Sequence, residues 1–214
     1  MVERLVLGDF GTCSYVVGEE GERQALVIDP ASDSKPILET LAARNWEAHY
    51  ILNTHGHADH IGGNAAIKRA FPRALLAIGK GDAPMLDRPG KNLSLFFGRW
   101  LKSPRADQLL EEGEILKTGG LSFQVMELPG HTPGGVGFFR EASKEEPPVL
   151  FCGDTLFAGG IGRADFPGSS ERLLMESITR KILALPDDTL LYPGHGPPTT
   201  VAREKQTNPF LEFQ

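Results

Sequence analysis

Residues with metal-binding side chains are concentrated in one seven-residue stretch of this sequence. Residues 54–60 read Thr-His-Gly-His-Ala-Asp-His and hold three of the chain's six histidines. Imidazole and carboxylate groups together suit zinc, iron or manganese. In an extended chain, residues two apart point the same way, so His55 and His57 can bind one ion. Asp59 and His60 follow where the chain must turn into a helix, and they can reach a second ion beside the first.

Three other residues of metal-binding type occur in a repeated local pattern. An apolar strand is followed by a glycine-rich turn and then by His131, Asp154 or His195. Glycine lets a turn approach an ion closely, because it has no Cβ atom. Four strand ends that carry such residues indicate one shared site at one edge of the sheets, rather than a solvated histidine-rich loop. His49 follows no such turn, and we expect it to be an ordinary histidine.

Apolar periodicity predicts the strands and helices that must position these residues. Nearly continuous apolar runs at 24–28 and 50–53 are typical of strands covered on both faces. The second run ends at the histidine cluster, and open α/β sheets usually form their sites at such carboxyl ends. Further strands are expected at 4–7, 13–17, 75–78, 121–128, 136–140, 149–152 and 189–192, and helices at 35–44, 61–71 and 171–185.

Two parts of the sequence allow more than one interpretation. Asp29 follows the run 24–28 and is either a plain loop residue or a residue that orients a ligand histidine. Residues 82–107 are rich in apolar side chains but are broken by glycine and proline. This segment is either a packed surface excursion or a flap that carries aromatic residues over the site. Its apolar part at 93–101 can also serve an interface, and the oligomeric state stays open.

Length, charge and cysteine content limit the number of domains, the kinds of partner and the cellular compartment that we expect. A chain of 214 residues can bury a sizeable core, and we predict a single domain over 1–214. The net charge of −6 and the pI of about 5.5 argue against nucleic acid as a partner. No apolar run approaches a membrane span and the N-terminus lacks a signal pattern, so we expect a cytoplasmic protein without a membrane partner. Cys13 and Cys152 are expected to be small buried side chains in a reducing compartment.

The histidine cluster and its partners resemble the signature of the metallo-β-lactamase superfamily. Residues 54–60 match its histidine motif, and His131, Asp154 and His195 follow in the expected order over nearly the whole chain. The resemblance implies an α/β fold of the αβ/βα type, a four-layer sandwich in which two mixed β-sheets pack face to face with helices outside. It also implies a binuclear metal site. The first ion would be held by His55, His57 and His131, the second by Asp59, His60 and His195, and Asp154 would bridge them.

Within this superfamily the sequence resembles the glyoxalase II-like branch, the hydroxyacylglutathione hydrolases. Residues 153–163 and the ending 207–211 carry this resemblance. It implies a small-molecule thioester substrate such as S-D-lactoylglutathione. Typical members add a C-terminal helical domain, and a Lys and a Tyr after the Asp-Thr-Leu-Phe motif. This chain has no room for that domain and has Gly-Arg-Ala-Asp-Phe at 162–166, so it looks like the short, single-domain members, and the thiol is left open.

The ligand set predicts hydrolysis by a metal-activated water. Two divalent ions about 3.5–4 Å apart, zinc first and iron or manganese as alternatives, can lower the pKa of a shared water towards neutrality. The hydroxide would attack a thioester carbonyl whose oxygen is polarised by one ion. Asp59 can orient the hydroxide and Asp154 can fix the spacing of the ions, so both are catalytic candidates. Arg163 is the best nearby cation for binding a substrate carboxylate, unless it forms a salt bridge with Asp165.

Three other functions are compatible with these residues. A persulfide dioxygenase, which uses a single iron, also resembles the chain, including the stretch 162–166. The complete set of second-site ligands favours hydrolysis, and oxygen consumption with a persulfide separates the two. A nuclease of the same superfamily is disfavoured by the acidic charge. A non-catalytic metal-binding or interaction domain would bind metal tightly without turnover.

Overall fold

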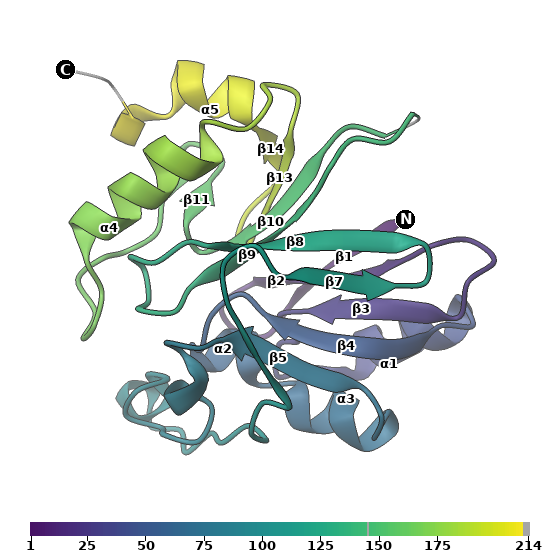
Figure 1. Cartoon of the computed structure of the whole chain (residues 1–214). Helices are drawn as coiled ribbons and strands as arrows, with labels where there is room; N and C mark the ends of the chain where they lie inside the picture. Colours follow the sequence, from purple (N-terminus) through teal and green to yellow (C-terminus); the bar gives the residue numbers. More distant parts are fainter. Residues whose placement is uncertain (145, 212–214) are drawn as a thin grey trace.

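Two mixed β-sheets form the centre of the protein (Figure 1). The computed structural model describes residues 1–144 and 146–211. The first sheet has the strand order β1 (Val2–Leu7), β2 (Thr12–Gly18), β3 (Gln24–Ile28), β4 (Glu47–Asn53), β5 (Leu75–Gly79) and β6 (Gln108–Leu110). Strands β1 to β3 pair antiparallel, whereas β3 to β6 run parallel.

The second sheet is formed by the later part of the chain. Its strand order is β14 (Thr199–Thr200), β13 (Leu190–Pro193), β10 (Val149–Gly153), β9 (Val136–Arg140), β8 (Leu121–Glu127) and β7 (Ile115–Thr118). Strands β7 to β10 pair antiparallel, and β10 lies parallel to β13. A short ribbon of β11 (Leu156–Phe157) and β12 (Gly160–Ile161) follows β10.

Large apolar side chains fill the space between the two sheets. Tyr15 and Leu26 from the first sheet lie in one buried cluster with Phe138 and Phe151 from the second. The rings of Tyr15 and Phe151 meet edge to face, with their centroids 5.0 Å apart. Because burial of apolar area is the main favourable term in folding, this cluster holds the sheets face to face.

Helices cover the outer faces of both sheets, as Figure 1 shows. Helices α1 (Lys35–Ala43) and α3 (Asn64–Ala70) pack on the first sheet, where Ile37 of α1 lies in one cluster with Val27 of β3. Helix α4 (Glu171–Glu176), which continues as a π-helical stretch (Ser177–Ile182), packs on the second sheet together with α5 (Val201–Thr207). The predicted four-layer αβ/βα sandwich is confirmed.

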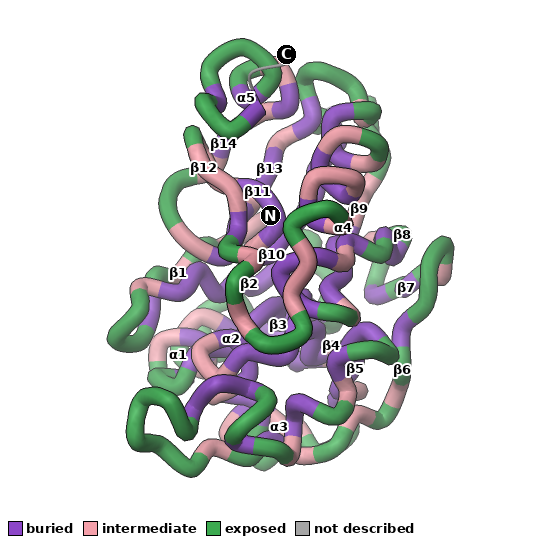
Figure 2. The backbone as a smooth tube through the Cα atoms, turned by 90° about the vertical axis from the view of Figure 1, so that its left-hand side faces the viewer, coloured by how far each residue is buried: buried purple, intermediate pink, exposed green. Residues whose placement is uncertain are grey.

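The side chains of β3 alternate between the two faces of the sheet, and both faces are buried, which explains the unbroken apolar run of this strand. Leu26 and Ile28 belong to the cluster between the sheets, whereas Ala25 and Val27 belong to the cluster under the helices. Successive side chains of a strand point to opposite faces, so a strand in the middle of four layers needs apolar residues at every position. Figure 2 shows this strand buried, while the outer connections are exposed.

The helix predicted over 61–71 is divided in the structure. Helix α2 (Ala58–Ile61) ends before Gly62 and Gly63, and α3 begins at Asn64. The glycines pass close to the connection between β3 and α1. A Cβ atom on Gly63 would lie 2.4 Å from both the Ala31 carbonyl oxygen and the Ser34 Oγ. This close approach requires glycine, which also weakens a continuous helix.

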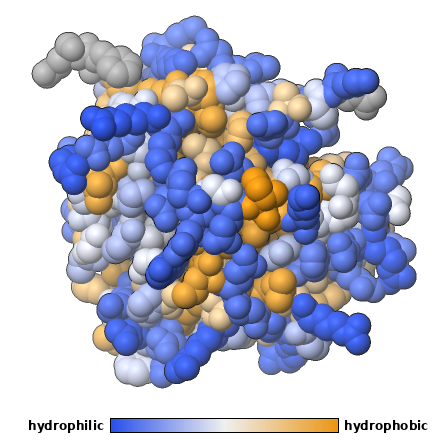
Figure 3. Space-filling model, in the orientation of Figure 1, coloured by the Kyte–Doolittle hydropathy of each residue, from blue (hydrophilic) through white to orange (hydrophobic). Residues whose placement is uncertain are grey.

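The segment between β5 and β6 is irregular but internally organised. It contains two short 3₁₀ turns, η1 (Ala83–Met85) and η2 (Ser94–Phe97). The buried Asn92 side chain donates to the carbonyl oxygens of Met85 and Leu101, both at 3.1 Å. No helix of the described residues is long and apolar enough to cross a membrane. The face drawn in Figure 3 is mostly hydrophilic, with apolar side chains in small separate groups.

A hydrogen bond between the sheets provides a test of this architecture. The Tyr15 hydroxyl on β2 donates to the Pro193 carbonyl oxygen on β13 at 2.6 Å, in a buried position. Tyr15→Phe leaves that carbonyl without its donor, so the free energy of unfolding should fall by about 1–3 kcal/mol. Urea denaturation measures the change. Tyr50→Phe is the control, because the Tyr50 hydroxyl makes no hydrogen bond within the described chain, and an equal loss in both variants would contradict the assignment.

Candidate metal centre

All seven predicted ligand side chains lie together at one edge of the two sheets. His55 and His57 follow β4, and Asp59 and His60 lie in α2 directly after them. The other three follow strands of the second sheet: His131 comes after β8, Asp154 after β10 and His195 after β13. The roles of these residues as metal ligands stay a prediction.

Three imidazoles form the first group of the site. One nitrogen from each of His55, His57 and His131 lies within 4.8 Å of the others. The nearest pair is His57 Nδ1 and His131 Nε2, at 2.9 Å. The Nε2 atom of His55 is buried and has no hydrogen-bond partner among the residues described. Because an unpaired buried polar atom is costly, a bound cation fits this group well.

Two imidazoles and a carboxylate form the second group. The Oδ2 atom of Asp59 lies 3.3 Å from the Nε2 atoms of both His60 and His195. These two Nε2 atoms are 3.3 Å from each other. Such a set of nitrogen and oxygen donors suits zinc, iron or manganese.

Asp154 contacts both groups. Its Oδ2 atom lies 3.6 Å from His131 Nε2 and 3.5 Å from His195 Nε2. Its Oδ1 atom is buried without a hydrogen-bond partner in the described part of the chain. A Cβ atom on Gly194 would lie 2.1 Å from this oxygen, so the turn before His195 must carry glycine here.

Backbone carbonyl oxygens fix the orientation of two histidines. The Nδ1 atom of His131 lies 2.8 Å from the Arg163 carbonyl oxygen, and that of His195 lies 3.2 Å from the Phe10 carbonyl oxygen. A carbonyl oxygen only accepts, so Nδ1 carries the proton in each ring. The Nε2 atoms therefore face the cluster, where each would supply a lone pair to a bound ion, and the Nδ1 contact is the usual second contact of a metal-binding histidine.

Asp29 orients His60 in the same way. The Asp29 carboxylate accepts hydrogen bonds from the Thr54 N–H at 2.7 Å and the Thr54 hydroxyl at 2.6 Å, and His60 Nδ1 lies 3.0 Å from its Oδ2. Asp29 also forms a geometric group with His55 and His60. Because both of its oxygens already accept these bonds, the structure supports the interpretation that Asp29 orients a histidine, not that it is a plain loop residue.

Asp82 is a site residue that the sequence analysis missed. Its Oδ2 atom accepts from the Gly56 N–H at 2.9 Å, and its Oδ1 atom accepts from the Gly134 N–H at 2.7 Å. The carboxylate thereby ties the turn of His55 and His57 to the turn after His131. Burial raises the pKa of Asp82, although these hydrogen bonds favour its charged form. Its sequence context, a strand followed by Gly-Lys-Gly-Asp, is the pattern that marked the other site residues.

The first group is electrostatically suited to neutral imidazoles. Burial, reinforced by the neighbouring imidazoles, lowers the pKa of His55 well below its ordinary value. Burial and the nearby His131 lower the pKa of His57 to about 3. Neutral imidazoles are the form that binds a metal ion, so His55 and His57 need no proton loss before they take up a cation.

The second group is held by opposite charges. Burial opposes a charge on His60, but the carboxylates of Asp59 and Asp154 outweigh it and raise the pKa of His60 well above its ordinary value. Burial likewise opposes a charge on His195, but hydrogen bonds with the same carboxylates raise its pKa to about 10. In spite of their own burial, Asp59 and Asp154 have lowered pKa values beside these imidazoles. A cation bound here would displace protons from the imidazoles.

A cavity of about 330 Å³ opens onto the two groups. Its wall contains five large apolar side chains from three parts of the chain, namely Phe10, Leu93, Phe97, Phe157 and Phe166. Leu93 and Phe97 belong to the segment 82–107. That segment therefore contributes an aromatic side chain to the site, as expected of the flap interpretation.

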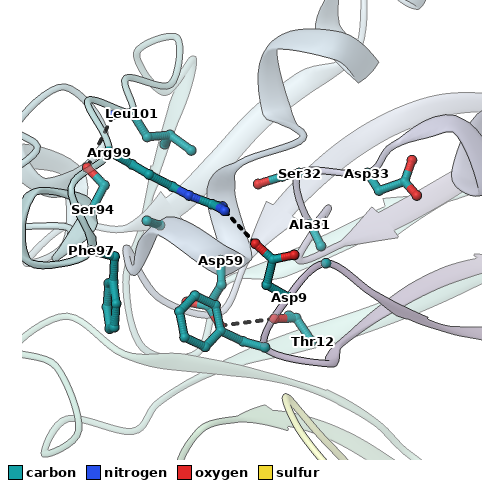
Figure 4. Close-up of a pocket in the computed structure, with 13 residues that line it drawn as sticks. Asp9, Thr12, Ala31, Ser32, Asp33, Asp59, Ser94, Phe97, Arg99 and Leu101 are labelled. Carbon is teal, nitrogen blue, oxygen red and sulfur yellow. Dashed lines mark hydrogen bonds and ion pairs between the residues drawn. The ribbon is translucent and has the colours of Figure 1, made fainter.

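A second cavity, of about 290 Å³, also includes Asp59 in its lining (Figure 4). The figure shows Asp9 and Arg99 paired with each other at this cavity, and Phe97 beside them. The Thr12 hydroxyl donates to Asp59 Oδ2 at 2.9 Å. Phe10 and Phe97 line both cavities, and their rings meet edge to face with centroids 4.9 Å apart.

Arg163 lies at the cavity in a salt bridge. Its Nε and Nη2 atoms donate to the two carboxylate oxygens of Asp165 at 2.9 and 2.8 Å. Its guanidinium carbon also lies 4.4 Å from the centroid of the Phe166 ring. The alternative considered from the sequence, a salt bridge to Asp165, is thus observed, and any binding of a substrate carboxylate must compete with it.

Comparison with known proteins agrees with this geometry. Residues 7–195 match the sequence profile of the Metallo-beta-lactamase superfamily. The chain belongs to the metallo-β-lactamase superfamily. A relative in Haemophilus influenzae, hydroxyacylglutathione hydrolase GloC, is 36% identical over 205 residues, which cover 93% of this chain and 92% of the relative. The superfamily and this relative's name support a hydrolase.

Solved structures of this superfamily share the fold. BLEG-1 B3 metallo-beta-lactamase superposes with a TM-score of 0.92 at 35% identity and covers 100% of both chains. ETHE1 from Myxococcus xanthus superposes with a TM-score of 0.81 at 29% identity, covering 98% of this chain and 83% of that one. Membership of the metallo-β-lactamase superfamily and the two groups of side chains support a binuclear divalent metal site.

The role of Asp29 can be tested by metal affinity. Asp29→Asn keeps the shape of the side chain but offers an amide where His60 Nδ1 and Thr54 need acceptors. The affinity for the ion at the second group, which contains His60, should fall by about 10–100-fold, as is usual when a group that orients a metal ligand is lost. Competition with a chelator, followed by metal analysis, gives the affinity. Asp33→Asn, at an exposed carboxylate nearby, is the control, and equal affinities in the two variants would show that Asp29 does not orient His60 for binding.

Proposed function

We propose that this protein is a binuclear metal-dependent hydrolase of the glyoxalase II type, which cleaves S-D-lactoylglutathione or a related hydroxyacyl thioester. The observation that carries the proposal is the convergence of two adjacent ligand groups with Asp154 in contact with both. The similarity to a hydroxyacylglutathione hydrolase supports a thioester as the bond that is cleaved. Both sheets contribute to the site, which supports a single domain over 1–214.

The proposed ligand assignment follows the two groups. His55, His57 and His131 would hold the first ion, Asp59, His60 and His195 the second, and Asp154 would bridge them. Zinc is the proposed metal, with iron and manganese as alternatives that accept the same donors. The orphaned His55 Nε2 and Asp154 Oδ1 atoms support this assignment, because a cation would satisfy both.

The chain's own residues supply positioning for the reaction. When bound, two divalent cations lower the pKa of a water molecule and polarise the substrate carbonyl. Asp59, held by the Thr12 hydroxyl, can orient the attacking water. Asp154 fixes the separation of the two groups. A thiolate leaves without a strong general acid, so a thioester suits a cavity in which every imidazole and carboxylate belongs to the two groups.

Aromatic side chains around the cavity would exclude water from the reacting ester. Phe97, Phe157 and Phe166 surround the approach to the two groups. A small acyl group can be enclosed there, while the thiol portion extends towards Arg163. This arrangement supports a small-molecule thioester substrate.

Thiol release from S-D-lactoylglutathione under anaerobic conditions tests the proposal. Metal-replete protein should release thiol, and removal of the metal by a chelator should abolish the activity. Asp154→Ala and His55→Ala should lower both metal content and rate by more than about 100-fold, because loss of an outer contact alone costs about 10–100-fold. His49→Ala, which removes a histidine away from the site, should retain both. Full activity of metal-free Asp154→Ala would refute the proposed function.

The competition between Asp165 and substrate for Arg163 gives a second test. Asp165→Asn removes the carboxylate that holds the guanidinium, so KM for S-D-lactoylglutathione should fall several-fold while kcat changes little. Arg163→Ala should raise KM several-fold, and its backbone contact with His131 is retained. The control substrate is a lactoyl thioester whose thiol portion has no carboxylate. Equal changes in KM for both substrates would exclude recognition of a carboxylate by Arg163.

An iron-dependent persulfide dioxygenase is the second candidate function. The structural similarity to ETHE1, with 29% identity over 98% of this chain, supports it. The same metal-replete preparation, given glutathione persulfide in air, distinguishes the two candidates. The hydrolase that we propose consumes no oxygen, whereas stoichiometric oxygen consumption with an iron-loaded protein would establish the dioxygenase.

A further inference from the structure

Positive charge is concentrated on one segment beside the cavity. Residues 88–105, which we call the basic–aromatic loop, contain no Asp or Glu, although the whole chain has 28 acidic and 22 basic residues. The basic residues of this loop are Arg88, Lys91, Arg99, Lys102 and Arg105. The blue-to-teal connection between β5 and β6 in Figure 1 contains the loop, next to α2. An acidic protein thus carries one exposed segment with five basic and no acidic residues.

The same loop exposes large apolar side chains. Phe96 is 70% and Trp100 71% exposed, and Leu95 and Phe97 are about half exposed. Single exposed apolar residues are common, but a contiguous group usually marks a binding surface. Phe10 extends the group, since its ring contacts Phe97. The exposed aromatic surface therefore reaches from the loop to the mouth of the candidate metal centre.

The exposure is a consequence of an ordered backbone. Leu93 and Gly98 both have positive φ angles, 67° and 68°, and they bracket the turn η2. A left-handed conformation is uncommon for leucine and persists only when its surroundings enforce it. The buried Asn92 anchors the turn through hydrogen bonds to Met85 and Leu101. Phe96 and Trp100 are thus held outward from a fixed turn instead of collapsing onto the protein.

Most of the basic groups on the loop are available for a ligand. Lys91 and Lys102 are exposed and make no ion pair with any described residue. Arg88 and Arg105 both approach Asp87, each at 3.9 Å, and their side chains are mostly exposed. Exposed pairs at this distance contribute little, so the arginines can turn to another anion. Only Arg99, which pairs with Asp9, has a close acidic partner.

We propose that the basic–aromatic loop docks on the surface of an anionic lipid bilayer. Phe96 and Trp100 would enter the headgroup region, where aromatic rings are favoured, and the Lys and Arg side chains would contact anionic headgroups. The loop projects Phe96 and Trp100 outward, with 70% and 71% of their surfaces exposed. A protein partner would need a complementary surface of about 800 Å², whereas a bilayer accepts such side chains without a preformed pocket. A surface contact needs no spanning helix, so it is compatible with the described helices, none of which is long and apolar enough to cross a membrane.

Trp100 provides a direct test, because the other tryptophan, Trp46, is buried at 4% exposure. The 214-residue chain is titrated with vesicles of phosphatidylcholine alone and of phosphatidylcholine mixed equally with phosphatidylglycerol. The mixed vesicles should shift the tryptophan emission to shorter wavelength and sediment the protein, and the neutral vesicles should do neither. High salt should reverse the binding, because it screens exposed charges. Trp100→Phe should lose the emission shift but still sediment.

Matched variants separate the contributions of charge and aromatic burial. Lys91→Glu/Lys102→Glu should weaken vesicle binding at least about tenfold. Lys35→Glu/Lys117→Glu, which makes the same change of net charge on exposed lysines elsewhere, should bind like the original protein. Phe96→Ala/Trp100→Ala should also lose binding, whereas Phe210→Ala, at another exposed aromatic residue, should not. Far-ultraviolet circular dichroism confirms that each variant is folded.

Three outcomes would overturn the proposal. The first is that neither kind of vesicle binds. The second is equal binding to neutral and anionic vesicles, unaffected by the lysine changes. The third is an emission shift with soluble polyglutamate but not with vesicles, which would assign the loop to an acidic protein partner instead. None of these outcomes depends on turnover, so the result is independent of the proposed thioesterase function.

Discussion

The geometry of the site depends on the buried carboxylate of Asp29. It joins the end of β3 to the turn after β4 through two short hydrogen bonds with Thr54, and it holds the ring of His60 through Nδ1. Hydrogen bonds to a carboxylate are stronger than those between neutral groups, and buried ones are not weakened by water. Because the ring cannot rotate without losing this contact, its Nε2 atom stays directed at Asp59 and His195.

A second buried carboxylate, that of Asp82, also fixes the geometry of the site through hydrogen bonds. Asp82 accepts hydrogen bonds from the backbone of two turns, and these turns carry the three imidazoles of the first group. A carboxylate is costly to bury, and both oxygens of Asp82 are paired with backbone N–H groups. The pairing with backbone N–H groups fixes the turns to each other without relying on flexible side chains. The seven polar side chains of the site can thus lie close together, because the turns that carry the first group are fixed relative to each other.

Much of this arrangement could be predicted from the sequence, for identifiable reasons. Apolar runs such as 24–28 predicted the central strands, because a strand buried on both faces needs apolar residues throughout. The strand–glycine–ligand pattern predicted which residues meet at one edge. Asp82 follows a strand and a glycine-rich turn like the other site residues, but its role was missed because its partners, the backbone N–H groups of Gly56 and Gly134, carry no sequence signal. The contact of His195 with the Phe10 carbonyl oxygen joins positions 185 residues apart, and backbone acceptors carry no sequence signal. The break between α2 and α3 depended on a close approach that only the packed structure reveals.

The ligand cluster and the cavity mouth are built by different kinds of structure. Strand ends and buried carboxylates hold the cluster, whereas the mouth is formed by the β1–β2 turn, the basic–aromatic loop and the residues after β10. Arg163 links the two, since its backbone orients His131 while its guanidinium lies at the cavity in a salt bridge. Substitutions of side chains at the mouth can therefore change what enters the site without moving the cluster. Phe97 lines the cavity and belongs to the exposed aromatic surface, so a surface that covers the loop would also control the approach of substrate.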